Sequence, residues 1–133
     1  MNIQFKSVAA LAATITATLT LSAVALDAKY QPIADSMKYT FKAPKGEKKV
    51  SEKIAEGTAT EDEIKKSLEL FKGMANTEPP KGDAAAFKEK VAKLISATED
   101  VLAKKEGAGA KFKEAADCKS CHKEFRPPEE KKP

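Results

Sequence analysis

The clearest structural signal in the sequence runs from Asp83 to Leu102 and reads DAAAFKEKVAKLISATEDVL. Its apolar side chains recur every three or four residues, which places them on one side of a helix, with lysine and glutamate on the other. This apolar stripe comprises Phe87, Val91, Leu94, Ile95, Thr98 and Leu102. Asp83 precedes the stripe and is suited to cap the first turn. We therefore expect an amphipathic helix that buries one face.

A second helix is expected just upstream, from Thr60 to Ala75. Thr60 and Glu63 have the spacing of a capping box at a helix start. The apolar stripe of this helix comprises Ile64, Leu68, Phe71 and Ala75. Met74 is interpreted as a packing or loop residue beside the stripe. Residues 76–82 contain two prolines and are expected to form the loop to the next helix.

An earlier helix is predicted around a face made of Ile33, Met37 and Phe41. Pro32 suits its first turn, where a missing backbone N–H costs nothing. Pro44 and Gly46 interrupt the pattern, so we expect this first helix to be broken near Pro44. A short continuation over residues 50–57 is expected to end at Gly57, a suitable C-cap.

The last predicted helix runs from Ala108 to Phe125, after a joint marked by glycines, and stops at two prolines. Residues 127–133 are expected to be a frayed tail. From Tyr30 onward no apolar and polar residues alternate over a sustained run, which argues against strands. Short joints between long amphipathic segments predict an all-α, antiparallel four-helix bundle over residues 26–133, a single domain.

Composition and charge restrict the function classes. The 133 residues carry 24 basic and 20 acidic side chains, for a net charge of +4. These charges are too balanced and interspersed for a nucleic-acid-binding stripe, so no nucleic-acid partner is expected. The single histidine, His122, excludes His-rich metal clusters. Nothing pairs a nucleophile with a base, so we expect no enzyme.

Residues 1–25 have the features of an export signal. Lys6 is the only charged residue among them, an uncharged run follows, and Ala23-Val24-Ala25 fits a signal-peptidase site. We expect cleavage after Ala25 and a periplasmic protein of a bacterium, with no stable membrane insertion afterwards. An uncleaved membrane anchor is the alternative, although the run is only marginally long enough and contains four threonines.

The sequence Cys118-Lys-Ser-Cys121-His122 is C-x-x-C-H, the attachment pattern of c-type haem. Cys118 and Cys121 lie one helical turn apart, so both can form thioethers to one porphyrin, and His122 can then bind the iron. Three alternatives compete. A zinc site would need further Cys or His ligands, a thioredoxin-like dithiol expects a βαβ setting, and a structural disulfide would close only a small loop.

The segment from Gly107 to Arg126, and above all CKSCHKEFR at residues 118–126, resembles the C-terminal haem helix of class II c-type cytochromes, the cytochrome c′ group and its low-spin relatives. The motif lies near the end of the chain, as in that family. The resemblance implies a four-helix bundle with one covalent haem c on the fourth helix, covered by the first, and frequent homodimers. The sequence departs from the family in the break near Pro44, and in Phe87 where tryptophan is common.

The sixth iron ligand decides between two functions. The resemblance places a methionine ligand in the region of Met37, which makes Met37 the expected sixth ligand beside His122. Five-coordinate relatives instead have a bulky apolar side chain nearby. An electron carrier is the first interpretation; a protein that binds nitric oxide or carbon monoxide at an open distal site is the alternative. A haem-free periplasmic thiol protein using Cys118 and Cys121 is a third.

Several other side chains are expected near the haem. Arg126 lies one turn beyond His122, and the resemblance places an arginine there at the border of the proximal pocket; a solvated helix-end arginine is the alternative. The aromatic residues expected to form the pocket wall are Phe41, Phe71, Phe87, Phe112 and Phe125. Lysines flanking the haem helix would steer an acidic redox partner; they are Lys104, Lys105, Lys111, Lys113, Lys119 and Lys123.

Overall fold

The structure is a computed structural model that describes residues 21–127, with the backbone alone for residues 21–27. Within this range every regular element is a helix, as the sequence predicts. The helices are α1 (Leu21–Thr40), α2 (Val50–Glu56), α3 (Glu61–Ala75), α4 (Ala84–Leu102), α5 (Ala108–Ala115) and α6 (Cys118–Phe125). Most of the predicted signal peptide, residues 1–20, and tail residues 128–133 lie outside the described residues.

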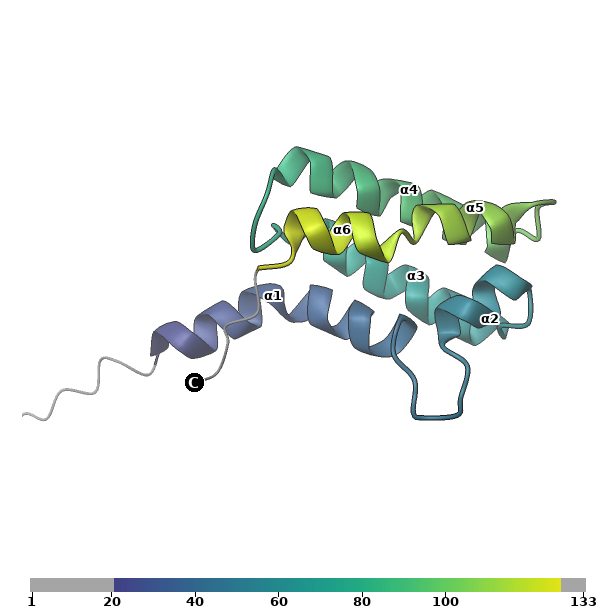
Figure 1. The fold of residues 1–133 in the computed structure, drawn as a ribbon, viewed down its shortest axis with the longest axis horizontal. Coiled ribbons are helices and arrows are strands. Elements are labelled where there is room, and N and C mark those ends of the chain that lie inside the picture. The colour runs from purple at the N-terminus through teal and green to yellow at the C-terminus, as the bar shows by residue number, and fades with distance from the viewer. Residues whose placement is uncertain (1–20, 128–133) are drawn as a thin grey trace, which may run out of the picture.

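The helices form a bundle in which α1 packs on α3, α3 on α4, and α4 on both α5 and α6 (Figure 1). Hydrogen bonds fix the direction of the first pair. The Ser36 hydroxyl donates to the Leu70 carbonyl at 3.0 Å, and the Thr40 hydroxyl lies 3.2 Å from that of Ser67. Because residue numbers rise along α1 while they fall along α3, the two helices are antiparallel.

The pairing of α4 with the end of the chain is also antiparallel. Lys111 Nζ of α5 lies 3.8 Å from Asp100 Oδ2, near the C-terminus of α4. Lys90, near the N-terminus of α4, donates a hydrogen bond to Ser120 of α6 at 2.6 Å. Residues 108–125 therefore run back along the whole of α4.

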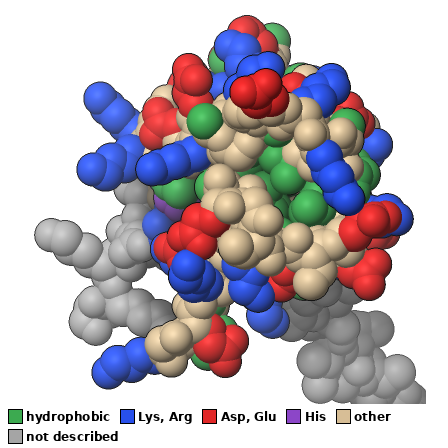
Figure 2. All heavy atoms as spheres, turned by 90° about the vertical axis from the view of Figure 1, so that its right-hand side faces the viewer, with side chains coloured by type: hydrophobic (Ala, Val, Ile, Leu, Met, Phe, Trp, Pro, Cys, Tyr) green, Lys and Arg blue, Asp and Glu red, His purple; other side chains and the backbone are tan. Residues whose placement is uncertain are grey.

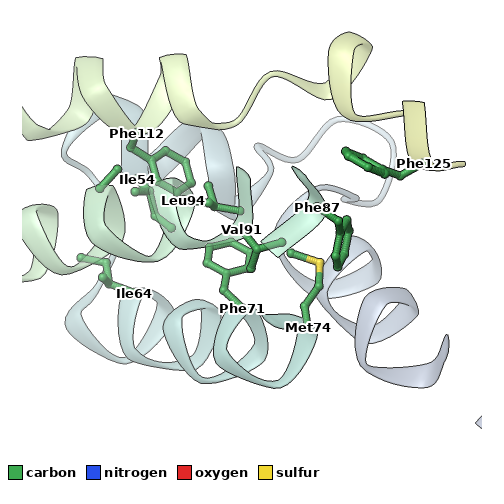
Figure 3. Packing of buried hydrophobic residues seen from close by; sticks show 10 residues of the cluster. Ile54, Ile64, Phe71, Met74, Phe87, Val91, Leu94, Phe112 and Phe125 are labelled. Carbon is green, nitrogen blue, oxygen red and sulfur yellow. The ribbon is translucent and has the colours of Figure 1, made fainter. Parts of the chain in front are cut away.

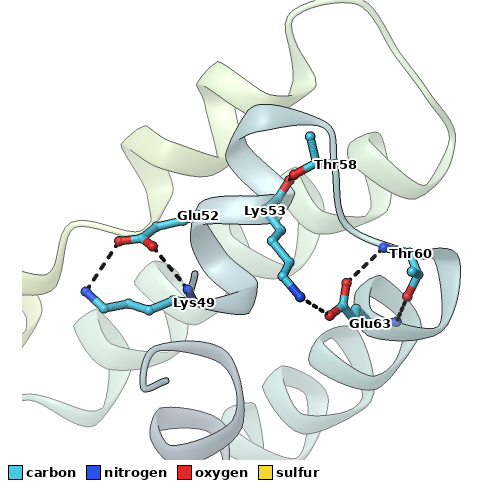
Figure 4. A network of polar contacts seen from close by, with 6 residues as sticks. All are labelled: Lys49, Glu52, Lys53, Thr58, Thr60 and Glu63. Atoms are coloured by element: carbon cyan, nitrogen blue, oxygen red, sulfur yellow. Dashed lines mark hydrogen bonds and ion pairs between the residues drawn. The ribbon is translucent and has the colours of Figure 1, made fainter. Parts of the chain in front are cut away.

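Local capping signals explain where the central helices begin. The Thr60 hydroxyl accepts a hydrogen bond from the Glu63 amide at 3.2 Å, and the Glu63 carboxylate accepts one from the Thr60 amide at 2.9 Å (Figure 4). Asp83 accepts from the Ala86 amide at 2.8 Å. Lys53 reaches from α2 to Glu63 at 2.7 Å (Figure 4), which ties the short helix to α3. The two predicted N-caps are thus confirmed.

The hydrophobic core lies between α2, α3, α4 and α5 and continues to α6 (Figure 3). The predicted stripes supply most of it. Its largest buried members are Ile54, Ile64, Phe71, Met74, Phe87, Val91, Leu94, Phe112 and Phe125. Met74 is 3% exposed, which confirms that it is a packing residue, but it lies on the buried stripe and not beside it. It follows Phe71 by three residues, which places both side chains on one face of α3.

The expected last helix is two helices. The chain leaves the helical conformation at Ala116 (φ −83°, ψ 40°) and Asp117 (φ −70°, ψ 90°). Asp117 then caps α6 by accepting a hydrogen bond from the Ser120 amide at 3.1 Å. Aspartate is among the preferred N-cap residues, and here it starts a new helix inside an otherwise helical pattern.

The first helix is interrupted as predicted, because α1 ends at Thr40 before Pro44. Pro32, however, lies inside α1 and not in its first turn, because α1 begins at Leu21. Its carbonyl accepts a hydrogen bond from the Ser36 hydroxyl at 2.9 Å.

Candidate functional site

A cavity of about 930 Å³ lies between α1, α3, α4 and α6. This volume is near the upper end of the range for small-molecule and cofactor pockets. Apolar residues predominate in its walls. They include Ile33, Met37, Phe41, Met74, Phe87, Val91, Leu94, Ala97 and Phe125. A flat apolar ligand with a few polar or reactive attachment points suits such a pocket.

All three chemically distinctive residues of the motif line this cavity. They are Cys118, Cys121 and His122. Their helix is short and begins at the Asp117 cap, so the first cysteine stands in its first turn and the second one turn later. Cys121 is half-buried, while Cys118 and His122 are exposed. Two thiols and one imidazole therefore converge on one side of the cavity.

Both thiols are free. The Cys118 thiol donates a hydrogen bond to the Ala116 carbonyl at 3.4 Å, in the break between α5 and α6. Burial raises the pKa of the Cys121 thiol, although the nearby Lys90 ammonium acts in the opposite direction. Burial thus favours the protonated form of the Cys121 thiol, and neither sulfur is held in a disulfide.

Methionine side chains line the cavity on other helices. Met37, on α1, lies between Ile33 and Phe41 on the helix face that is packed against the core. Met74 reaches the same cavity from α3. The predicted apolar face of α1 thus borders the space that the motif borders from α6.

The phenylalanines expected to form the pocket wall divide into two groups. Phe41, Phe87 and Phe125 line the cavity, and the rings of Phe87 and Phe125 meet edge to face with centroids 5.2 Å apart. Phe71 and Phe112 do not line it and are buried in the core instead (Figure 3). Phe112 belongs to α5, which packs on α4 and α2, so its assignment to the pocket wall was wrong.

Lys90 anchors the motif helix to α4. Its ammonium donates to the Ser120 hydroxyl at 2.6 Å, forms an ion pair with Glu124 at 3.0 Å, and lies 5.6 Å from the centroid of the Phe125 ring. Ser120 lies between the two cysteines. Sequence reasoning missed Lys90, because a lysine at the edge of an apolar stripe looks like any solvated helix lysine.

The loop between α3 and α4 packs against the other end of the motif helix. Gly82 has a φ of +82°, and a Cβ atom there would lie 2.8 Å from the Glu124 carbonyl oxygen and 2.9 Å from the Phe125 ring. Only glycine permits both this conformation and this approach. Gly82 thereby lets the loop cover the last turn of α6.

The basic residues are distributed differently from the expectation. Arg126 lines the cavity, and its backbone amide donates to the His122 carbonyl at 3.1 Å. Lys104 and Lys105 instead line a separate hollow of about 610 Å³ at the end formed by α2 and the α4–α5 connection. Figure 2 faces this end and shows acidic and basic side chains interspersed around apolar ones. These two lysines therefore do not surround the motif.

Among residues 21–127, no group of three or more His, Cys, Asp and Glu side chains is arranged to hold a metal ion. Over the same residues, no helix combines the length and the apolar character needed to cross a membrane.

No protein-family model, curated protein or solved structure matches the chain.

Proposed function

We propose that the protein is an exported monohaem cytochrome of the class II c type that carries single electrons between redox partners. The observation that supports this most directly is that Cys118, Cys121 and His122 on α6 and Met37 on α1 line one apolar cavity. The C-x-x-C-H pattern alone points to haem attachment, and the cavity supplies a suitable space beside it.

The two thiols would hold the cofactor covalently. Each S–H would add across one vinyl group of the porphyrin, forming a carbon–sulfur bond while the thiol hydrogen passes to the other vinyl carbon. The chain's free thiols at Cys118 and Cys121 meet this requirement. His122, next to the second thioether, would bind the iron through an imidazole nitrogen.

Met37 would bind from the α1 wall. A bound haem supplies an iron that gains or loses one electron. A thioether ligand from Met37 would favour the reduced form and raise the reduction potential. The apolar side chains around Met37 would also disfavour the extra positive charge of the oxidised form.

The remaining parts of the proposal come from the sequence. The export signal over residues 1–25 directs the chain to the bacterial periplasm, where haem attachment to C-x-x-C-H and contact with redox proteins would take place. We propose one haem c per chain, proteins as electron donors and acceptors, and a homodimer as the assembly implied by the family resemblance.

The experiment is the visible spectrum of the chain produced in a host able to attach haem, in both oxidation states, with carbon monoxide added to the reduced form. We expect haem that stays with the polypeptide on a denaturing gel, a red-region sulfur-to-iron band in the oxidised form, and no response to the gas. Met37→Ala should abolish the band, whereas Met74→Ala, its matched control on α3, should retain it.

Other outcomes separate the alternatives. A high-spin oxidised spectrum with prompt gas binding would reject Met37 as a ligand and favour the diatomic-gas binder. Loss of the red-region band in Met74→Ala alone would transfer the ligand role to α3. A chain without any covalent haem would reject the cytochrome proposal and leave a thiol protein.

A further inference from the structure

One segment accounts for the net positive charge of the whole chain. Residues 38–49, KYTFKAPKGEKK, contain five lysines and one glutamate, a net charge of +4. The whole chain also has a net charge of +4, so its other residues sum to zero. We call residues 38–49 the basic segment. It covers the end of α1 and the connection to α2.

Three lysines of the basic segment have no ion-pair partner among residues 21–127. Lys48 pairs with Glu56 at 2.6 Å and Lys49 with Glu52 at 3.6 Å. Across residues 21–127, no acidic side chain forms an ion pair with the other three lysines, which are Lys38, Lys42 and Lys45. Their charge therefore remains available to attract an anionic surface.

The same segment carries an exposed aromatic residue. Tyr39, 36% exposed, is the one large hydrophobic side chain that is exposed among residues 28–127. Tyrosine is enriched at protein interfaces, where its ring adds contact area and its hydroxyl adds a hydrogen bond. An uncompensated charge and an unburied aromatic ring thus coincide within a few residues.

The connection has a defined shape. The Glu47 amide donates to the Pro44 carbonyl at 3.1 Å, and Gly46, the third residue of this turn, has a φ of +91°. This is the pattern of a type II turn, whose third residue needs the positive φ that glycine permits. Figure 1 shows the connection between α1 and α2 projecting from the bundle. Lys45 lies within this turn, Lys42 precedes it, and Lys38 lies in the last turn of α1.

The basic segment also adjoins the cavity. Phe41 and Lys42 belong to the segment and line the cavity that Cys121 and His122 border from α6. A partner that binds the segment would be close to whatever the cavity holds. Because electron transfer slows steeply with distance, a partner bound here would be well placed to exchange electrons with a group in the cavity.

We propose that the basic segment is the docking surface for an acidic protein that exchanges electrons with the group held in the cavity. The role of the partner rests on the proposed function, whereas the surface itself does not. A protein is favoured over an anionic membrane because the segment exposes one aromatic side chain, Tyr39 at the end of α1, next to an ordered connection that adjoins the cavity. A membrane anchor would instead use a continuous apolar face.

The first experiment uses the haem-free full-length chain and measures its binding to a decaglutamate peptide at low and high salt. We expect Lys38→Gln/Lys42→Gln/Lys45→Gln to lower the affinity at least tenfold at low salt, with the difference shrinking at high salt. The matched control removes three exposed lysines elsewhere, Lys81→Gln/Lys88→Gln/Lys104→Gln, and should change the affinity no more than about twofold. Equal losses in the two triple variants would overturn the proposal.

Two further arms complete the test. The haem-free chain should bind phosphatidylcholine vesicles with one quarter phosphatidylserine no better than pure phosphatidylcholine vesicles. Strong binding to the former, with none to the peptide, would replace the protein partner by a membrane.

In the haem-loaded chain, electron transfer from the hexacyanoferrate(II) anion should slow several-fold in the basic-segment variant and not in the control. If the chain attaches no haem, the proposed function is rejected, whereas the peptide measurement still tests the basic segment as a docking surface.

Discussion

The two helices at the end of the chain, α5 and α6, are attached to the bundle in different ways. In α5, Phe112 is 1% exposed and Gly109 packs directly against the Ala55 carbonyl of α2. In α6, Phe125 is the one buried side chain, and Lys90 supplies the polar contacts. One half of a predicted single helix closes the core, while the other half leaves its reactive side open to a cavity. Structural and chemical roles are thus divided at Asp117.

The largest test of this contrast compares the two buried phenylalanines in the haem-free chain. Phe112→Ala should lower the free energy of unfolding by about 3–5 kcal/mol, because a fully enclosed ring leaves a cavity in the core. Phe125→Ala should cost less, because α6 can detach while the rest of the bundle stays folded. Urea unfolding followed by circular dichroism measures both. A cost for Phe125→Ala equal to that for Phe112→Ala would reject the division of roles.

A second test concerns the close approach of α5 to α2. Gly109→Ala should cost about 1–3 kcal/mol, because the new Cβ would collide with the Ala55 carbonyl oxygen, a backbone atom that cannot move alone. Gly73→Ala is the matched control within α3, since its Cβ would meet only the Pro32 Cβ at 3.9 Å. This variant should be neutral or up to about 1 kcal/mol more stable from helix propensity. Thermal unfolding that gave both variants the same sign would contradict the packing described for α5.

A smaller effect is expected at the anchor of α6. Lys90→Met removes the contacts to Ser120 and Glu124 but keeps much of the apolar stem, and should weaken the attachment of α6 by about 1 kcal/mol. Amide hydrogen exchange in residues 118–125 should then accelerate several-fold, with little change in α3. Lys72→Met is the control, because Lys72 pairs with Glu99 at 3.4 Å between α3 and α4. Acceleration of α6 in both variants would remove the special role of Lys90.

The smallest effect concerns the pH dependence of the link between α4 and α5. The hydrogen bond from Lys105 holds the pKa of the Asp100 carboxyl below its ordinary value, and Lys111 adds to this effect. A lowered pKa in the folded state stabilises the protein above the pKa of the unfolded chain, and this stability is lost as the pH falls through the folded value. The unfolding free energy of Asp100→Asn should therefore fall less steeply below pH 4 than that of the wild type. Parallel pH profiles would show that the ion pairs contribute nothing.

Local signals in the sequence predicted the central helices well. The caps at Thr60 and Asp83 and the apolar stripes of α3 and α4 depend on residues that are close in the sequence. They can therefore be recognised without knowledge of the fold. The proximity of Cys118, Cys121 and His122 was predictable for the same reason. Met74 was correctly predicted to be a packing residue but was placed beside the stripe, although its three-residue spacing from Phe71 indicates a position on it.

Other features depend on how distant segments meet, and no local pattern encodes them. Lys90 becomes an anchor only because α6 lies over the first half of α4. Phe112 does not line the cavity, because the helix is interrupted at Ala116–Asp117 and α5 packs against α2 and α4. The break itself had a signal, the Asp117 cap, but the surrounding helical pattern concealed it.

The position of the cavity also has a consequence for the topology of the chain. Met37 and Cys121 border the same cavity from helices at opposite ends of the described sequence. A ligand bound to both would close a loop of about 80 residues, and cross-links that close long loops remove the most conformational freedom from the unfolded chain. Such a ligand would link α1 to α6, so that neither helix could detach from the bundle without affecting the other.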